Sequence, residues 1–491
     1  MFKHWTMKAL FCASLIFGAG IPALAKPQPM TAERIAEIDT FVEERMEALA
    51  IPGVAIALIE DGALVHARGF GVTGEGGDPV SEKTMFQTGS ISKTFAATAI
   101  LQLASEQRIG LDDPVVKHLP WFRTISKARS DTITVRHLLS HRSGLSMFKG
   151  NRNQDGGSDG ADAMELAVRE LAGQKLQSEP GALYEYSNAN YQILGTLLEA
   201  IEGQSYEEIL KKRIFETAGM SRSLVTMATA SQQDAAQGHR YWLTRPLVYT
   251  SEAGRAVLAQ GGVSSSSSDL ATYLISFINN DNQLVAEGLQ AEMLTSEETG
   301  PGPHYALGWF TRAFEDHRLI FHTGSNPGYE AVAGFSPEKK FGFVVLANAN
   351  SSFGNRDVAT LTLGVGNMVM GLPVSPASPD MVSRIGYFII CLIPLFMISV
   401  IVGFFLIRKS LVSLKGQPLS GAVLLRLVLP SLALLALAWL LLITIPQVNG
   451  APVPAIALFN PDIGLALRTG GYLALFWASV RPILRWRAGR A

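Results

Sequence analysis

The stretch Gly89-Ser90-Ile91-Ser92-Lys93-Thr94-Phe95 lies where a turn-rich segment passes into the apolar run 95–103. If a helix begins near Ser90, Lys93 stands one turn further along on the same face. A serine hydroxyl becomes a nucleophile when a neighbouring base removes its proton, and a lysine amine can be that base where burial keeps it neutral. Free N–H groups at the start of the helix would face a developing oxyanion. This stretch therefore predicts a serine nucleophile.

Ser-x-x-Lys is a weak pattern by itself, because a helix-capping serine followed by an exposed lysine gives the same spacing. The pattern occurs at Ser90/Lys93, Ser146/Lys149 and Ser336/Lys339. Ser336 is followed by a proline, which is typical of a turn between strands. Ser146 lies in a loop rich in Gly, Asn and Asp. Ser90 opens an apolar helix and is therefore the candidate.

The composition limits the kinds of partner. The chain of 491 residues is long enough for two or three domains. Its net charge is −1, with 17% charged residues, so no basic surface predicts a nucleic-acid partner. Mean hydropathy is +0.21, and the apolar excess lies at the two ends. Cys12 and Cys391 are in those ends, which excludes a disulfide framework or a cysteine-ligated metal between them.

His137 and His141 stand four residues apart, which is the spacing of a zinc pair on a helix. No glutamate follows His137 in the metalloprotease pattern, and no third ligand is evident. Packing and capping at the end of a short helix over 135–144 are the favoured roles. We therefore expect no metal site, and no motif indicates a cofactor.

Residues 1–25 have the pattern of a cleaved secretory signal. Lys3 and Lys8 precede the apolar core 9–21, and Ala23-Leu24-Ala25 is a cleavage site of the A-x-A type. The core is too short to span a bilayer comfortably. We expect the mature chain to begin near Lys26, outside the cytoplasm.

The middle of the chain alternates between helix and strand patterns. An amphipathic helix follows Thr31, and strands at 54–60 and 63–71 are joined by Asp61-Gly62, a strong hairpin signal. Helices are predicted over 135–144, 191–202 and 269–277, the last capped by Ser268, with a flexible loop at 150–161. Further strands are predicted at 318–322, 330–335 and 341–346.

The C-terminal part predicts a membrane region. A proline-rich linker over 372–384 would reach about 40 Å if extended. Apolar spans are predicted at about 385–407, 427–445 and 463–480. Lys and Arg are concentrated in the loop 408–426 and in the tail, whereas the loop 446–462 has none. The positive-inside rule then places the C-terminus in the cytoplasm and the preceding domain on the extracytoplasmic side of the cytoplasmic membrane.

Two further motifs follow Ser90 and Lys93 along the chain: Tyr186-Ser187-Asn188 at the start of a helix, and His322-Thr323-Gly324-Ser325 at the end of a strand. In this order the three motifs resemble those of the serine β-lactamase and penicillin-binding protein superfamily. The tyrosine of the middle motif is most similar to the class C β-lactamase branch. The resemblance covers about 31–370 and includes the blocks 138–145, 180–188, 261–265, 307–309 and 341–348.

The resemblance implies a role for each motif residue. Ser90 would be the acylated nucleophile and Lys93 the neighbour that accepts its proton. Tyr186 would take part in proton transfer to the leaving group and in activating the deacylating water. Asn188 would hydrogen-bond the substrate amide or Lys93. The N–H groups of Ser90 and Ser325 would form the oxyanion hole.

The third motif departs from the family pattern. His322, Thr323 and Gly324 are expected on the substrate-binding strand, but the family commonly has lysine where this chain has His322. A lysine attracts a substrate carboxylate, whereas a histidine with an ordinary pKa is mostly neutral at pH 7. The difference weakens the case for recognition of penicillin or D-Ala-D-Ala and leaves room for an esterase or another peptidase. If His322 faces the substrate, carboxylate substrates should bind better towards pH 6.

The implied fold is α/β, with an antiparallel sheet flanked by helices and a mostly helical insertion over about 95–300. The expected organisation is a signal peptide at 1–25, a hydrolase domain at 26–371, a linker at 372–384 and a three-helix membrane region at 385–491. The leading function is a membrane-anchored extracytoplasmic serine hydrolase that forms an acyl-enzyme with a peptide, amide or ester. The alternatives are a true β-lactamase and a penicillin-binding sensor that is acylated without turnover. The sequence leaves the oligomeric state open.

Overall fold

The computed structural model describes residues 27–151, 158–281, 283–298, 302–351, 357–376, 381–406 and 421–490. It forms two compact units, the first running to Ser378 and the second from Pro379 onward. The boundary falls inside the linker expected at 372–384. The expected signal peptide lies outside the described residues, as do much of the loop 150–161 and most of the loop 408–426.

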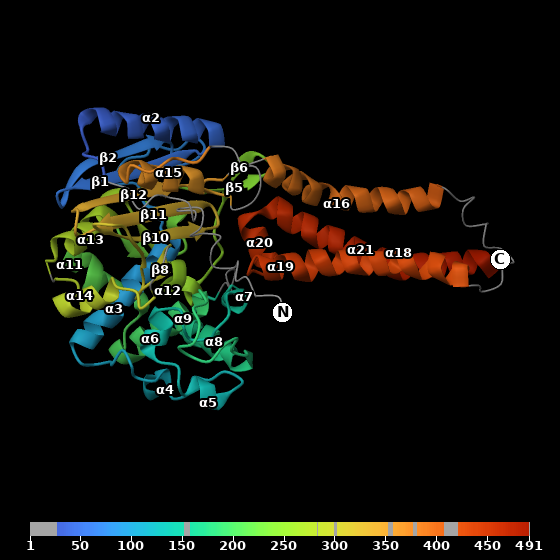
Figure 1. Ribbon diagram of the computed structural model, residues 1–491, viewed down its shortest axis with the longest axis horizontal. Helices are drawn as coiled ribbons and strands as arrows, with labels where there is room; N and C mark the ends of the chain where they lie inside the picture. Colours follow the sequence, from blue (N-terminus) through green and yellow to red (C-terminus); the bar gives the residue numbers. More distant parts are fainter. Residues whose placement is uncertain are drawn as a thin grey trace. The chain divides into compact units, whose positions relative to one another are not determined.

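Unit 1 is built on a seven-stranded antiparallel sheet in the order β2-β1-β12-β11-β10-β9-β8 (Figure 1). Asp61 and Gly62 both have positive φ, as the predicted tight turn between β1 and β2 requires. The predicted mixed α/β fold with an antiparallel sheet is confirmed. The strands are β1 Gly53–Glu60, β2 Ala63–Gly71, β8 His304–Tyr305, β9 Phe310–Ala313, β10 Arg318–Asn326, β11 Tyr329–Ser336 and β12 Phe341–Ala347.

Both faces of the sheet are buried at β1 and β12, which explains why these two strands are almost wholly apolar. In β1, Ala55 and Ala57 pack on one side, whereas Val54, Ile56 and Leu58 pack on the other. The second side is covered by α2 (Ala32–Leu49) and α15 (Ala359–Val369). The first side is covered by α3 (Ser92–Ser105), α9 (Asn188–Glu202) and α13 (Ser267–Asn279), as Figure 1 shows for unit 1.

The insertion between the sheet's first and last strands is mostly helical, as predicted. Gly203 ends α9 in the left-handed conformation, which glycine adopts readily. The remaining helices are α4 Val115–His118, α5 Lys127–Ser130, α6 Val135–Leu139, α7 Met147–Gly150, α8 Ala163–Arg169, α10 Tyr206–Leu210, α11 Glu216–Ala218, α12 Leu258–Gly261 and α14 Glu287–Met293, with shorter turns η1 Gly89–Ile91, η2 Glu170–Gly173, η3 Lys211–Phe215, η4 Thr229–Ser231 and η5 Arg255–Val257.

Two small sheets in unit 1 were not predicted. One joins β13 (Ala349–Asn350), β5 (Gly238–Trp242) and β6 (Arg245–Tyr249), and the other joins β3 (Phe86–Gln87), β7 (Val263–Ser265) and β4 (Leu224–Val225). The prediction that Ser268 caps α13 was also wrong. Ser266 is the cap, and its hydroxyl accepts the N–H of Asp269 at 3.1 Å. The cap was misplaced because the sequence offers five consecutive serines.

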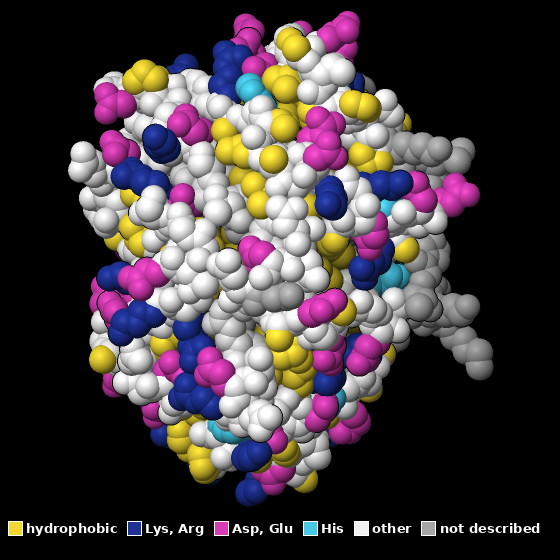
Figure 2. Space-filling model, turned by 90° about the vertical axis from the view of Figure 1, so that its left-hand side faces the viewer, with side chains coloured by type: hydrophobic (Ala, Val, Ile, Leu, Met, Phe, Trp, Pro, Cys, Tyr) yellow, Lys and Arg dark blue, Asp and Glu magenta, His cyan; other side chains and the backbone are white. Residues whose placement is uncertain are grey.

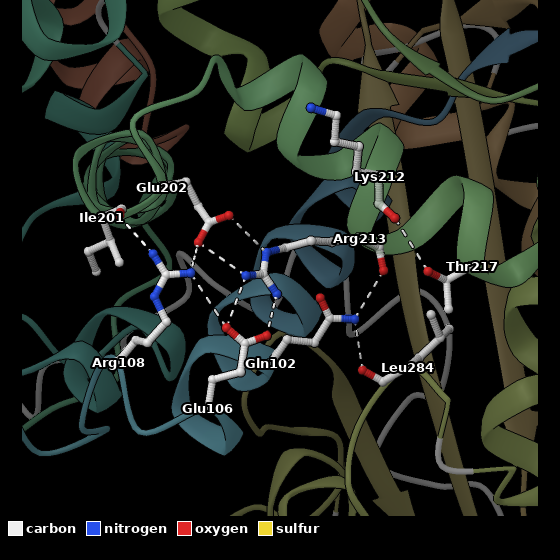
Figure 3. Close-up of polar contacts among 9 residues, drawn as sticks. All are labelled: Gln102, Glu106, Arg108, Ile201, Glu202, Lys212, Arg213, Thr217 and Leu284. Carbon is white, nitrogen blue, oxygen red and sulfur yellow. Dashed lines mark hydrogen bonds and ion pairs between the residues drawn. The ribbon is translucent and has the colours of Figure 1, made fainter.

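An ion-pair network joins the end of α3 to the end of α9 and to the π-helical turn η3 (Figure 3). Arg213 pairs with Glu106 at 2.7 Å and with Glu202 at 3.1 Å, and Arg108 also pairs with Glu202. Gln102 donates to the carbonyl of Arg213 at 3.1 Å. These contacts raise the pKa of Arg213 and lower that of Glu106. The network fixes the outer end of α3, whose other end carries Lys93.

Unit 2 contains three helical stretches long and apolar enough to cross a membrane: Arg384–Phe405, Val428–Val448 and Pro461–Leu484. They pack on one another within the unit through buried side chains that include Met397, Ala438 and Trp477. Gly470 packs against Ile393. The helices are α16 Met381–Leu406, α18 Gly421–Trp439, α19 Ile445–Val448, α20 Val453–Phe459 and α21 Pro461–Arg490, with a π-helical turn η6 Leu440–Thr444 after α18.

Candidate active site

Ser90 lies on the one-turn 3₁₀ helix η1 that leads directly into α3. The α-helix therefore begins at Ser92, two residues later than the sequence suggested. Gly89 has a φ of 53°, and a Cβ added there would lie 2.4 Å from the backbone nitrogen of Ser325. Only a glycine allows this turn to approach β10 so closely. Ser90 itself remains partly exposed, so a substrate can reach its hydroxyl.

Lys93 lies under Ser90 and is fully buried. Its Nζ is 2.9 Å from the Ser90 Oγ and donates to the backbone carbonyl of Gln260 at 2.7 Å. The rings of Tyr186 and Tyr191 lie 5.1 Å and 5.8 Å from the same nitrogen.

These surroundings decide the charge of the Lys93 amine. Two ring faces would favour an ammonium by about 1–2 kcal/mol each, whereas removing it from water costs several kcal/mol. Burial therefore prevails and lowers the pKa of Lys93 well below its ordinary value. A neutral amine in this position can accept the proton of the Ser90 hydroxyl.

Tyr186 lies before α9, and its ring packs on a buried histidine. The ring of His141 is 4.2 Å from that of Tyr186, centroid to centroid. The Nδ1 of His141 accepts the N–H of Ser187 at 3.2 Å and lies 2.9 Å from the side-chain nitrogen of Asn190. Burial, together with the nearby Lys93, lowers the pKa of His141 well below its ordinary value. His141 thus has the packing role expected for it, and that role is at the candidate active site.

Asn188 is the first residue of α9 and follows the N-cap Ser187. Its side-chain nitrogen donates to Asn151 at 2.8 Å. Its side-chain oxygen is buried and has no hydrogen-bond partner among the described residues. The side chain of Asn188 therefore bonds Asn151 and not Lys93, which was one of the two partners expected for it, and its oxygen is left as an acceptor.

Strand β10 brings Thr323, Gly324 and Ser325 to the nucleophile. The strand runs on to Asn326, so the third motif lies within β10 and not at its end. A Cβ on Gly324 would lie 1.8 Å from the carbonyl oxygen of Thr88 and 3.2 Å from the Ser90 nitrogen. This close packing of two backbones brings the amides of Ser90 and Ser325 together. Thr323 and Ser325 are partly exposed beside them.

His322 is turned away from solvent and is 1% exposed. Its Nδ1 lies 2.6 Å from the carbonyl oxygen of Thr323, to which it must donate, and its Nε2 accepts the hydroxyl of Tyr305 at 3.1 Å. Both contacts suit a neutral imidazole. Burial, with the nearby Lys93, lowers the pKa of His322 to about 3. The gain in carboxylate binding expected towards pH 6 therefore has no physical basis in this geometry.

A carboxyl group lies behind Ser325 that the sequence did not single out. Glu330 stands opposite Ser325 in the β10–β11 pair, and Asn350 donates to both side chains at 2.6 Å. Burial raises the pKa of Glu330 to about 8, with a smaller contribution from Asp357. The sequence could have indicated that Ser325 pairs with Glu330 only if the register between β10 and β11 had been known.

The other two Ser-x-x-Lys occurrences have structural roles. The Ser146 hydroxyl caps α7 by accepting the N–H of Lys149 at 3.2 Å. Ser336 is the last residue of β11, and its hydroxyl donates to Glu338 at 3.1 Å. In the described residues, neither serine has the fully buried lysine neighbour that distinguishes Ser90.

The sequence profile described as Beta-lactamase matches residues 38–365. The chain is 27% identical over 328 residues to Protein flp of Staphylococcus aureus (strain MW2), a match that covers 66% of this chain but 65% of that relative. The octameric penicillin-binding protein homologue from Pyrococcus abyssi is similar in structure, with a TM-score of 0.60, 30% identity and coverage of 70% of this chain and 79% of that one. D-alanine carboxypeptidase AmpC from Burkholderia cenocepacia shares the fold at a TM-score of 0.57 and 23% identity, over 69% of this chain and 99% of that one.

Proposed function

The chain belongs to the serine β-lactamase and penicillin-binding protein superfamily, and from that premise we propose that unit 1 is a serine hydrolase acting through an acyl-enzyme. The observation that carries the proposal is the 2.9 Å contact between the Ser90 Oγ and the fully buried Lys93 amine. Hydrolases and penicillin-binding proteins of this superfamily share that chemistry, whereas the substrate is particular to each.

Acylation begins when Lys93 accepts the Ser90 proton and the Ser90 Oγ attacks the substrate carbonyl. The carbonyl oxygen becomes an oxyanion that faces the N–H groups of Ser90 and Ser325. Such preorganised donors typically contribute about 3–4 kcal/mol each to transition-state stabilisation. The proton then passes to the leaving group, which departs as the ester between Ser90 and the acyl group forms.

Tyr186 carries the proton in this scheme, because its partly exposed ring lies over the Lys93 amine. After the leaving group departs, the same pair of Lys93 and Tyr186 removes a proton from water, and the hydroxide attacks the acyl ester. The bond between the acyl carbon and the Ser90 Oγ then breaks, the Ser90 Oγ takes the proton back, and the acid product is released. The buried ring of His141 holds Tyr186 in place by packing against its ring. The side-chain oxygen of Asn188, which is buried without a partner among the described residues, accepts an N–H of the substrate once binding makes that oxygen accessible.

The substrate is an ester, amide or peptide without a required carboxylate. The two basic side chains of the motifs, Lys93 and His322, are neutral and already hydrogen-bonded within the protein. Neither is available to attract a substrate carboxylate. This supports an esterase or a peptidase of broad charge preference over a penicillin-specific β-lactamase.

Unit 2 anchors the enzyme in the cytoplasmic membrane. Three apolar helices support this part of the proposal. Arg and Lys residues between the first two helices and in the tail, with none in 446–462, support a cytoplasmic C-terminus and an extracytoplasmic unit 1.

The test is covalent labelling of the full-length protein in detergent with a fluorophosphonate, followed by mass spectrometry of the labelled peptide. The adduct is expected on Ser90, and the Ser90→Ala variant should not label. Ser146→Ala is the matched control and should label like the parent. An adduct on Ser146 or Ser336 would refute the site assignment.

Turnover separates an enzyme from a sensor. Hydrolysis of a p-nitrophenyl ester or a chromogenic cephalosporin should proceed through many cycles per molecule. One stoichiometric burst followed by no further product would instead support a penicillin-binding receptor. Turnover of the ester without labelling by penicillin would favour the esterase.

A further inference from the structure

The β5–β6 hairpin of unit 1 has one exposed face and one face that is only partly buried, since Val248 on the second face is 48% exposed. Cross-strand pairing places Arg240 opposite Leu247 and Trp242 opposite Arg245. These four side chains therefore share one face of the hairpin. Trp242 is 40% exposed and Leu247 52% exposed. On the other face, Tyr241 is buried.

The exposed face is apolar, aromatic and cationic. Between residues 238 and 251 the chain has two arginines and no acidic residue. The guanidinium of Arg240 stacks 3.8 Å over the ring of Tyr249. By contrast, the face of the molecule in Figure 2 has Lys and Arg interspersed with Asp and Glu, and its apolar areas are small. Tryptophan, tyrosine and arginine together are typical of surfaces at a lipid headgroup layer.

The tip of the hairpin carries another apolar side chain. Leu243 has a φ of 58°, a region ordinarily left to Gly, Asn or Asp in such turns. Leucine there keeps an apolar group at the tip in a backbone conformation that L side chains rarely adopt. A tip that faced only water would be more stable with Asn-Gly.

The hairpin and the C-terminal segment of unit 1 both contact the end of α2. The Tyr241 hydroxyl donates to the carbonyl of Leu49, the last residue of α2, at 2.8 Å. One turn earlier on α2, Arg45 donates to the carbonyl of Ser375 in the linker. From Ser375 to the start of α16 at Met381 there are six peptide steps, which reach about 20 Å at most.

We propose that the exposed face of the β5–β6 hairpin rests on the anionic phospholipid headgroups of the membrane that unit 2 spans. The proposal rests on the membrane anchoring proposed above. Trp242, Leu243 and Leu247 enter the headgroup layer, and Arg240 and Arg245 meet lipid phosphates. The contact fixes the orientation of unit 1, and so of Ser90, above the bilayer.

The experiment uses the full-length chain with Cys12 and Cys391 replaced by alanine and one new cysteine carrying an environment-sensitive fluorophore. The positions are Leu247→Cys on the hairpin, Leu64→Cys on β2 and Phe396→Cys in α16. Leu64 is a matched control because its exposed fraction, 43%, is similar to that of Leu247. Leu64 pairs with Ile59 near the end of β1, whereas the strands beside the hairpin, β12 and β13, meet the opposite end of β1 at Val54. Phe396, 62% exposed in α16, reports membrane insertion.

Each variant is placed in nanodiscs that contain phosphatidylglycerol and lipids with a nitroxide, which lies near the headgroup for positions 247 and 64 and deep in the acyl chain for position 396. Quenching at position 247 should be at least twofold stronger than at 64, and it should fall towards the value at 64 in Arg240→Gln/Arg245→Gln. Fluorophosphonate labelling of Ser90 equal to that of the parent shows that each variant is folded.

The outcomes are distinct. Strong quenching at 396 with equal, weak quenching at 247 and 64 overturns the hairpin proposal and leaves the anchoring intact. Absence of quenching at 396 by lipids with a deeper nitroxide overturns the anchoring, and the hairpin proposal with it. Quenching at 247 that is unchanged in discs of phosphatidylcholine alone contradicts the role of the two arginines.

Discussion

Replacing Lys93 by methionine separates the catalytic role of the amine from its cost to folding. Methionine, like lysine, has an unbranched side chain, and it can occupy the buried position of Lys93 without a titratable group. Loss of a general base typically slows a reaction by about 10²–10⁴, which corresponds to about 3–5 kcal/mol of activation free energy. The acylation rate with a p-nitrophenyl ester should fall by that amount.

The stability of Lys93→Met should differ from the parent in a pH-dependent way. The folded parent holds a neutral Lys93 because burial lowers its pKa, whereas the unfolded chain holds an ammonium until about pH 10.4. Between the lowered pKa and pH 10.4 the unfolded state therefore binds one more proton. The free energy of unfolding of the parent then rises with pH by about 1.4 kcal/mol per unit from this group alone. Lys93→Met lacks this contribution.

The assay is thermal unfolding of both full-length proteins in detergent, followed by the fluorescence of tryptophans such as the buried Trp309. From pH 8 to pH 9, the midpoint of the parent should rise relative to that of Lys93→Met by about 2 °C. Contributions of all other groups cancel in the difference. A constant difference across this range would show that Lys93 is charged in the folded protein, and the general-base argument would fail.

Two further predictions concern strand β10. Gly324→Ala should lower kcat by about 10²–10³, because its Cβ would press on the Thr88 carbonyl and separate the two oxyanion-hole amides. The control is Gly173→Ala, whose Cβ meets nothing within 4 Å and which should leave kcat unchanged. Equal activities of the two variants in an ester assay would exclude the oxyanion hole at Ser325. His322→Lys should lower the thermal midpoint and the rate with neutral and carboxylate esters alike, because it buries an amine without an acidic partner beside Lys93; a selective gain in carboxylate binding would restore the idea that this position faces the substrate.

The sequence predicted those parts of the fold whose pattern is local. Asp61-Gly62 located the first hairpin, since the required positive φ values suit these two residues. The hairpin over 238–249 was missed because its turn at Leu243 contains neither Gly nor Asn, and because its exposed face is partly apolar. Strands β8 and β9 are too short for their alternation to be distinguished from a loop.

The site was predictable to the extent that its chemistry lies within one helical turn. Ser90 and Lys93 are three residues apart, and any helix at that point brings them together. The orientation of His322 depends instead on the register of β10 and on Tyr305, which comes from the separate strand β8. A pattern in one strand does not reveal which face a side chain takes when both faces are buried.

The amine of Lys93 and the imidazole of His322 are neutral for different reasons. Among the described groups, burial alone lowers the pKa of Lys93, whereas the pKa of His322 is lowered by burial together with Lys93. A lysine at position 322 would add a second buried amine beside Lys93. The two amines would then share the same few hydrogen-bond acceptors, the carbonyls of Gln260 and Thr323. With histidine, the tyrosine rings and the Tyr305 hydroxyl enclose the site without a net charge. The proposed base is then neutral because of packing, and neither basic motif residue provides a counter-ion for a charged substrate. This supports the proposal that esters and amides of different charge are handled alike.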